Sequence, residues 1–230
     1  MRKILYSLVC VIFTLAPTSA FSNLLVNGGY ESPDISGNFQ RYDEVTGAPN
    51  GFGWTISFPY VDHVNSLWSG ISGTSNPDGY DQSIRLILFG TLYQTFDTVP
   101  GKTYQLTFYY SHAPYPYDFA GAAGFVALLN GSGPYHHNEH LHNPNIILSD
   151  HILHSEPTSS NDMKWSEYKL TFRAVGETTT LAFQNDWEYN SCAGCDIDLS
   201  GFVVDDVKVA LVEAKKAKPM PWIPLLLLED

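Results

Sequence analysis

Alternating apolar and polar residues predict β-strands along the second half of the chain. Successive side chains of a strand point to opposite sides, so every second residue shares a face. Three segments show this alternation, and their apolar faces are formed by Tyr104, Leu106, Phe108 and Tyr110, by Tyr168, Leu170, Phe172 and Ala174, and by Thr179, Leu181 and Phe183. Helical periods are few. The pattern therefore predicts an all-β chain.

Turn residues between the apolar runs indicate how the strands are connected. Short apolar runs at 82–90 and 124–131 end in glycine, and Pro100-Gly101 fits a type II turn that joins two antiparallel strands. Many short strands with such turns are typical of a jelly-roll β-sandwich. Residues 111–163 are rich in His, Pro, Tyr, Asn and Gly, and we expect long loop insertions there, with one strand-like stretch at 124–129.

The two ends of the chain depart from the strand pattern. Residues 1–20 combine Arg2 and Lys3 with an apolar stretch and small residues, which is typical of a secretory signal peptide. Residues 21–212 form the predicted jelly-roll domain, and residues 213–230 form a linker and a short apolar tail. Neither apolar end is long enough to span a bilayer. We therefore expect a secreted, extracellular or cell-surface protein with no membrane span in the mature chain.

Charge and cysteine content narrow the possible partners. The formal net charge is −12, and such a surface repels phosphate, so a nucleic-acid partner is not expected. The acidity is explained either by solubility or by cation binding. Beyond the leader, only Cys192 and Cys195 are present, as C-x-x-C. In an oxidising compartment we favour a local disulfide over zinc, because a zinc site needs further ligands at suitable spacing.

The last predicted strand, within 201–211, carries a carboxylate on its more apolar face. That face is formed by Val203, Asp205, Val207 and Val209. A buried carboxylate is costly unless it is paired, hydrogen-bonded or bound to a metal. The sequence NLLVNGGYES at 23–32 predicts a first strand that ends at Glu31. First and last strands of a jelly roll commonly lie side by side, which would bring Glu31 close to Asp205.

Two neighbouring carboxylates repel each other unless a cation joins them, and hard oxygen ligands suit Ca²⁺. A structural calcium ion held by Glu31 and Asp205 is therefore one interpretation of these residues. The other is an ordinary hydrogen-bonded pair that caps turns.

Blocks in a fixed order resemble a known family. They read NLLVNGGYESP, YQTFDTVPGKTYQLTFYYS, WSEYKLTFRAVGETTTLAFQND and FVVDDVKV, and they are similar to the choice-of-anchor C family and to a related domain-of-unknown-function class that includes plant cell-wall proteins. The resemblance covers most of residues 23–211. It implies an extracellular, non-catalytic β-sandwich of the galactose-binding-like type, similar to carbohydrate-binding modules. In related modules an N-terminal Glu and a C-terminal Asp, here Glu31 and Asp205, help to hold structural calcium.

A histidine-rich stretch at 135–145 is a second possible metal site. Its imidazoles belong to His136, His137, His140 and His142. His136-x-x-Glu139-His140 matches the spacing of one class of zinc protease, whose chemistry needs both histidines on one helical face. Pro134 and Pro144 leave room for barely two helical turns. Binding of Zn²⁺ or Cu²⁺ and a solvated polar loop are both compatible with the stretch.

Aromatic residues in predicted loops are candidates for sugar binding, because sugar rings present apolar faces that stack on aromatic side chains. These candidates are Tyr60, Trp68, Tyr115, Tyr117, Trp187 and Tyr189. Burial in a large sandwich is the alternative role for such residues. The chain contains no G-x-S-x-G nucleophile motif and no glycine-rich phosphate loop before a helix.

The expected function is a secreted, non-catalytic module that binds carbohydrate or a cell-surface polymer and contains a structural calcium ion. One alternative is a structural or matrix protein that mediates protein contacts. Another is a metal-dependent hydrolase that uses the histidine-rich stretch.

Overall fold

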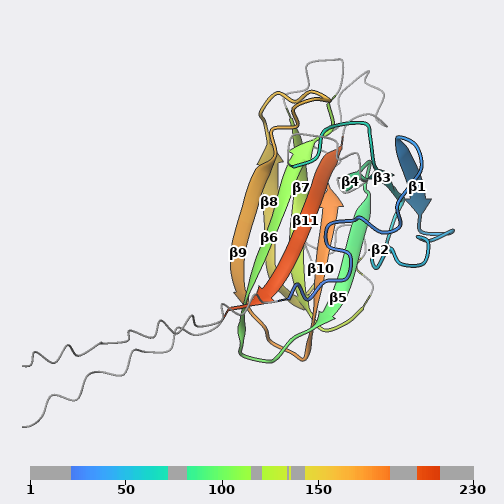
Figure 1. Cartoon of the computed structure of the whole chain (residues 1–230). Helices are drawn as coiled ribbons and strands as arrows, with labels where there is room; N and C mark the ends of the chain where they lie inside the picture. The colour runs from blue at the N-terminus through green and yellow to red at the C-terminus, as the bar shows by residue number, and fades with distance from the viewer. Residues whose placement is uncertain are drawn as a thin grey trace, which may run out of the picture.

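The computed structural model describes residues 22–71, 82–114, 121–133, 135, 143–186 and 201–212. Within this part of the chain there are eleven β-strands and no helix (Figure 1). In chain order they are β1 (Phe39–Asp43), β2 (Thr55–Ile56), β3 (Tyr60–Val64), β4 (Ser83–Leu86), β5 (Thr91–Asp97), β6 (Thr103–His112), β7 (Ala122–Asn130), β8 (Ile146–His154), β9 (Ser166–Arg173), β10 (Thr178–Asn185) and β11 (Phe202–Leu211). The described residues include no helix that is long and apolar enough to span a membrane.

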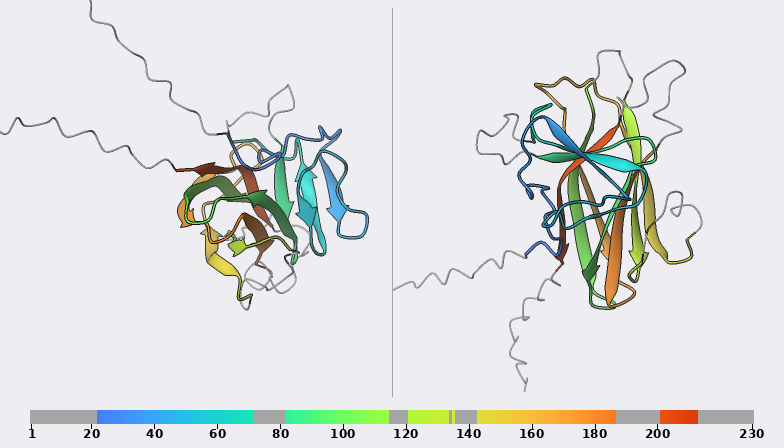
Figure 2. Two further views of the ribbon diagram at one scale, coloured as in Figure 1. Left: turned by 90° about the horizontal axis from the view of Figure 1, so that it is seen from below. Right: turned by 90° about the vertical axis from the view of Figure 1, so that its right-hand side faces the viewer.

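The strands form two antiparallel sheets that pack face to face (Figures 1 and 2). Sheet A has the order β1-β3-β4-β11-β6-β9, and sheet B has the order β2-β5-β10-β7-β8. The strands from β4 to β11 form a rolled-up hairpin, in which β4 pairs with β11, β5 with β10, β6 with β9 and β7 with β8. This nested pairing defines a jelly roll, so the predicted fold class is confirmed.

The core between the sheets contains the rows of apolar side chains that the alternation predicts. Leu106 and Phe108 of β6 are fully buried there, and so is Phe183 of β10. The Phe108 ring stacks on Tyr168 at 4.8 Å and meets Phe183 edge-on at 4.9 Å. Aromatic pairs in these geometries stabilise a core beyond the area that they bury.

The turn at Pro100-Gly101 is present, but it does not join paired strands. Lys102 N donates to Val99 O at 3.1 Å, and Gly101 has a φ of +79°, as a type II turn requires. The strands on either side, β5 and β6, belong to different sheets. The expectation of an antiparallel pair is therefore wrong, because the turn forms a corner between the two layers.

The expectation of long loops over residues 111–163 is also wrong in part, because β7 and β8, which lie within this range, pair with each other in sheet B. The sequence of β8, IILSDHILH, lacks a clean alternation. As the edge strand of sheet B, it exposes Ser149, Asp150 and His151 in its middle, and these polar residues obscure its apolar positions.

The two ends of the domain lie side by side, although the predicted first strand is absent. Residues 24–29 form bends and turns and run along the second half of β11. Leu24 N donates to Val209 O at 2.9 Å, and Val207 N donates to Gly28 O at 2.8 Å. A Cβ at Gly28 would lie 2.0 Å from Val207 O, so only glycine allows this approach.

A β-bulge in β11 changes which residues face the core. The register with β6 shifts between Asp205 and Lys208, and Asp206 has a φ of +47°. Before the bulge Val204 packs in the core, and after it Val207 does. The expected single inward row of Val203, Asp205, Val207 and Val209 is therefore wrong. Asp205 is buried, but it lies with Val203 on the outer side of sheet A.

Candidate functional site

Glu31 lies where the N-terminal segment meets the start of β4. Gln82 N donates to both carboxylate oxygens of Glu31, at 3.3 and 3.4 Å. The Gln82 side-chain amide donates to Tyr30 O at 3.2 Å and to Pro33 O at 3.1 Å, and its oxygen accepts from Ile35 N at 3.0 Å. One residue thus holds the whole turn that carries Glu31.

Asp205 borders the same place from β11. The paired residues of β4 and β11 end at Ile84 and Val204. Continuing this antiparallel pairing places Asp205 beside the start of β4, next to Gln82. The Tyr30 hydroxyl is fully buried and has no hydrogen-bond partner. Burial raises the pKa of Tyr30 well above its usual value, and the negative charge of Asp205 raises it further. We call Tyr30, Glu31, Gln82 and Asp205 the terminal junction.

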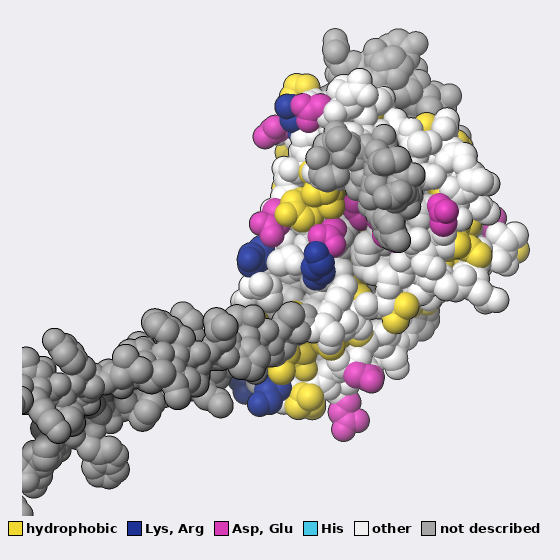
Figure 3. Space-filling model, viewed as in Figure 1, with side chains coloured by type: hydrophobic (Ala, Val, Ile, Leu, Met, Phe, Trp, Pro, Cys, Tyr) yellow, Lys and Arg dark blue, Asp and Glu magenta, His cyan; other side chains and the backbone are white. Residues whose placement is uncertain are grey.

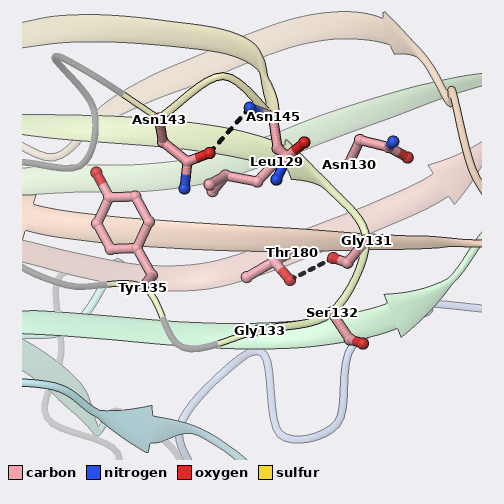
Figure 4. Close-up of a pocket in the computed structure, with 9 residues that line it drawn as sticks. All are labelled: Leu129, Asn130, Gly131, Ser132, Gly133, Tyr135, Asn143, Asn145 and Thr180. Carbon is pink, nitrogen blue, oxygen red and sulfur yellow. Dashed lines mark hydrogen bonds between the residues drawn. The ribbon is translucent and has the colours of Figure 1, made fainter.

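A pocket of about 110 Å³ opens on the outer face of sheet B, where β7 leads towards β8 (Figure 4). Its lining residues are Leu129, Asn130, Gly131, Ser132, Gly133, Tyr135, Asn143, Asn145 and Thr180. None of these nine side chains carries a charge. Three are amides, two are aliphatic hydroxyls and one is a phenol, so hydrogen-bonding groups that are not ionised dominate the pocket.

Hydrogen bonds hold both rims of the pocket. On one rim, Thr180 Oγ1 donates to Gly131 O at 2.8 Å (Figure 4). On the other, Asn143 Oδ1 accepts from Asn145 N at 2.9 Å, and Asn145 O accepts from Asn130 N at 2.8 Å. These bonds leave the side chains of Ser132 and Asn145 exposed at the pocket. The rims are therefore fixed before any ligand arrives.

The phenol ring of Tyr135 closes the inner side of the pocket. It packs on Ala127, Leu129 and Ala182, which face outward from sheet B, and only 1% of Tyr135 is exposed. The outer face of sheet A is different, because it carries Lys and Arg interspersed with Asp and Glu (Figure 3). The uncharged pocket thus lies on the opposite side of the sandwich from this charged face.

Comparisons with known proteins place the chain in a family. No curated protein matches it. The family described as "Protein of unknown function (DUF642)" matches residues 23–210. The chain belongs to the DUF642 family. The expected relationship to a domain-of-unknown-function class is confirmed at this level, and membership of the choice-of-anchor C family stays a prediction.

Several solved structures resemble this DUF642 protein. TmCBM61 in complex with β-1,4-galactotriose is 11% identical, with 83% of this chain and 99% of that chain covered and a TM-score of 0.45. The CBM22-1 xylan-binding domain from Paenibacillus barcinonensis Xyn10C is 14% identical, with 78% and 98% covered and a TM-score of 0.40. A CBM4 structure is 11% identical, with 81% and 98% covered and a TM-score of 0.39. At these scores the likeness identifies neither a ligand nor a site in the DUF642 protein.

The structure describes two of the six aromatic candidates, and neither offers an exposed ring face in a loop. Only 5% of Trp68 is exposed, and its indole N–H donates to Ser83 Oγ at 3.1 Å, so its predicted exposure is wrong. Tyr60 is half-buried in β3, with the Arg41 guanidinium over its ring at 4.0 Å.

The remaining sequence-based candidates lie outside the described residues of the DUF642 protein. They are the aromatic residues Tyr115, Tyr117, Trp187 and Tyr189, the histidines His136, His137, His140 and His142, and the cysteines Cys192 and Cys195. The predicted signal peptide over 1–20 and the predicted linker and tail over 213–230 lie outside them as well.

Sequence reasoning missed a buried ionic cluster in sheet A. Asp62 is fully buried and accepts from Arg41 Nε at 2.7 Å and from the Arg85 guanidinium. Arg85 Nε is buried and has no hydrogen-bond partner. A charged residue inside the short strand YVDHV was the available signal, because a buried charge needs a partner.

It also missed a pair of imidazoles that links the sheets. His112 Nδ1 and His154 Nδ1 are 2.8 Å apart, joining the ends of β6 and β8. His154 Nε2 must donate to Lys164 O, 2.7 Å away, so His154 Nδ1 accepts from His112. His112 Nε2 then accepts from Thr158 Oγ1 at 3.0 Å. No sequence pattern predicts this contact, because the two histidines are 42 positions apart.

Proposed function

We propose that this DUF642 protein is a non-catalytic module that binds carbohydrate in the pocket beside β7 and β8. The uncharged, hydrogen-bonding lining of that pocket is the observation that carries the proposal. Amides and hydroxyls both donate and accept hydrogen bonds, so they match a ligand whose surface consists of hydroxyl groups.

Replacing both Ser132 and Asn145 with alanine is expected to weaken glycan binding about tenfold or more. A hydrogen bond contributes about 0.5–1.5 kcal/mol and tenfold in affinity equals about 1.4 kcal/mol, so two lost bonds suffice. Wild-type protein is first screened on a glycan array, and the strongest ligand is then titrated by calorimetry. Asn161→Ala, at an exposed loop position before β9, is the matched control. Unchanged affinity in the double variant, or an array on which the wild type binds nothing, would contradict the proposal.

We also propose that a hard cation, by ligand type Ca²⁺, binds at the terminal junction. Two carboxylates, Glu31 and Asp205, border the junction, and the Tyr30 hydroxyl is a buried oxygen without a hydrogen-bond partner. Among the described residues, no group of three or more His, Cys, Asp or Glu side chains could hold a metal. Since Ca²⁺ takes roughly six to eight oxygens, backbone carbonyls and water would complete its shell.

Chelation is expected to lower the melting temperature of the purified protein by about 5–10 °C. A ligand at 100 times its Kd stabilises the native state by about 2.7 kcal/mol, and about 2–4 °C corresponds to each kcal/mol in a domain of this size. Differential scanning calorimetry with and without EDTA measures the shift. Asp205→Asn should abolish the sensitivity to EDTA. Asp206→Asn should retain it, because Asp206 pairs with Lys208 at 2.6 Å on the surface. A wild-type protein that is insensitive to EDTA argues against the cation.

A further inference from the structure

The outer face of sheet B continues from the pocket along β7 and β8. Ala182 of β10, Ala127 of β7 and Ser149 of β8 lie opposite one another in register. Ala127 faces outward beneath Tyr135, and Ser149 therefore faces outward too. The next outward pair in the same direction is Phe125 and His151. Polar and aromatic groups thus follow the pocket along the strands.

β8 is the edge strand of sheet B, and its outward residues are exposed. Asn145, at the pocket rim, and Ser149 are exposed, and 46% of the His151 side chain is exposed. From residue 145 to residue 151 the chain advances six residues, which at about 3.3 Å per residue is about 20 Å. That length is several times the width of one pyranose ring.

His151 is held in place by two neighbours. Its Nε2 lies 2.9 Å from Asp186 Oδ2, and its ring stacks on Phe125 at 4.6 Å with an interplanar angle of 27°. A side chain that is already ordered loses less conformational entropy when a ligand binds. Its ring can contact the apolar face of a sugar, and Ser149 offers a hydroxyl beside it.

The charges along these strands favour an uncharged ligand. β7, β8 and β10 contain no Lys or Arg. The acidic groups near the outward residues are Asp186, beside His151, and Asp150, whose carboxylate accepts from the Tyr168 hydroxyl at 2.6 Å. An acidic polysaccharide would meet negative charge here and no cationic side chain from these three strands.

We propose that the pocket, Ser149 and His151 form one continuous strip that binds a linear, uncharged oligosaccharide along β8. This inference rests on the proposed function of the pocket and adds that the ligand is a chain rather than a single sugar. One end of the ligand occupies the pocket, and the following sugars cross Ser149 and then His151.

The test titrates the full-length protein with linear oligosaccharides of one to six residues from β-1,4-glucan, β-1,4-galactan and β-1,3-glucan. Affinity should rise about tenfold from the disaccharide to the tetrasaccharide and then level off, because the sugars beyond the pocket gain about two hydrogen bonds. The double variant Ser149→Ala/His151→Ala should bind the tetrasaccharide only as well as the disaccharide. Its affinity for the disaccharide should equal that of the wild type.

A control variant and the choice of ligands separate the strip from the pocket. Ser155→Ala, at an exposed position just after β8, should leave all affinities unchanged, and His151→Gln replaces the ring if alanine disturbs the fold. Equal affinity for all chain lengths would overturn the strip and leave the pocket intact. If oligogalacturonate, titrated in the same way, binds more tightly than the uncharged chains, the proposal that the ligand is uncharged is overturned. Binding of no oligosaccharide at all would overturn the strip together with the proposed function.

Discussion

Acidification from pH 7 to pH 4 is expected to lower the free energy of unfolding by about 6 kcal/mol. Burial lowers the pKa of His63 to about 4, although the hydrogen bond from its Nε2 to Tyr30 O acts in the opposite direction. Burial and then the charge of His154 lower the pKa of His112 to about 4. Each shift from about 6.5 in the unfolded chain corresponds to about 3 kcal/mol.

The direction of this pH effect follows from which state of the chain, native or unfolded, binds more protons. Between pH 6.5 and pH 4 the unfolded chain binds protons at both histidines while the native chain does not, so stability rises with pH across this window. Protonation of His112 would add a proton at its Nε2, which accepts from Thr158 Oγ1 in the neutral state, so the Thr158 hydroxyl would have to turn from donor to acceptor.

Urea unfolding at pH 7, 6, 5 and 4 measures this loss of stability. His112→Gln should remove about half of the pH dependence, because His63 still titrates. His151→Gln is the control, since His151 lies on the surface at the edge of sheet B and not in the core. A free energy of unfolding that stays constant from pH 6.5 to pH 4.5 would show that these imidazoles are not buried in their neutral form.

Asp62→Ala is expected to destabilise the protein by about 3–5 kcal/mol. Asp62 is fully buried between β1 and β4 and accepts hydrogen bonds from Arg41 and Arg85. Its removal leaves the buried Arg85 guanidinium without this acceptor, and an uncompensated buried charge is costly. Arg85 Nε already lacks a partner, so the variant would leave a second part of this buried guanidinium unsatisfied.

Urea denaturation at pH 7 tests the cost of losing Asp62. Asp206→Ala breaks the surface pair with Lys208 and should change stability by less than about 1 kcal/mol. The double variant Asp62→Met/Arg85→Met should be more stable than Asp62→Ala, because it removes the orphaned charge together with its partner. Equal loss in Asp62→Ala and Asp206→Ala would contradict a buried ionic cluster in sheet A.

Alternation alone was sufficient to predict the strands that have one face in the core. β6, β9 and β10 follow it, because their inner residues pack between the sheets while most of their outer residues are polar. β8 is an edge strand with polar residues in its middle. Its sequence therefore lacks the alternation, although the strand is nine residues long. The alternation of apolar and polar residues reflects which side chains are buried, and the side chains of an edge strand are buried only in part.

The residues of the candidate site were likewise predicted from the sequence only in part. Asp205 was predicted to be buried and is, but the bulge at Asp206 places it on the other side of β11. A one-residue shift moves every later side chain of the strand to the opposite face. The apolar alternation in the sequence runs through the bulge unchanged, so it does not reveal the shift. The pocket depends on Gly131 and Thr180, which are 49 positions apart and meet through the pairing of β7 with β10.

The sequence by itself determined that the chain is all-β and folds as a jelly roll, because apolar periodicity and turn residues act locally. That its two ends meet was expected only as a consequence of the jelly-roll topology. The tertiary structure alone decided the bulge in β11, the imidazole pair between the sheets and the uncharged pocket. Each of these brings together residues that are distant in sequence, and their contacts exist only after strand pairing has fixed the register.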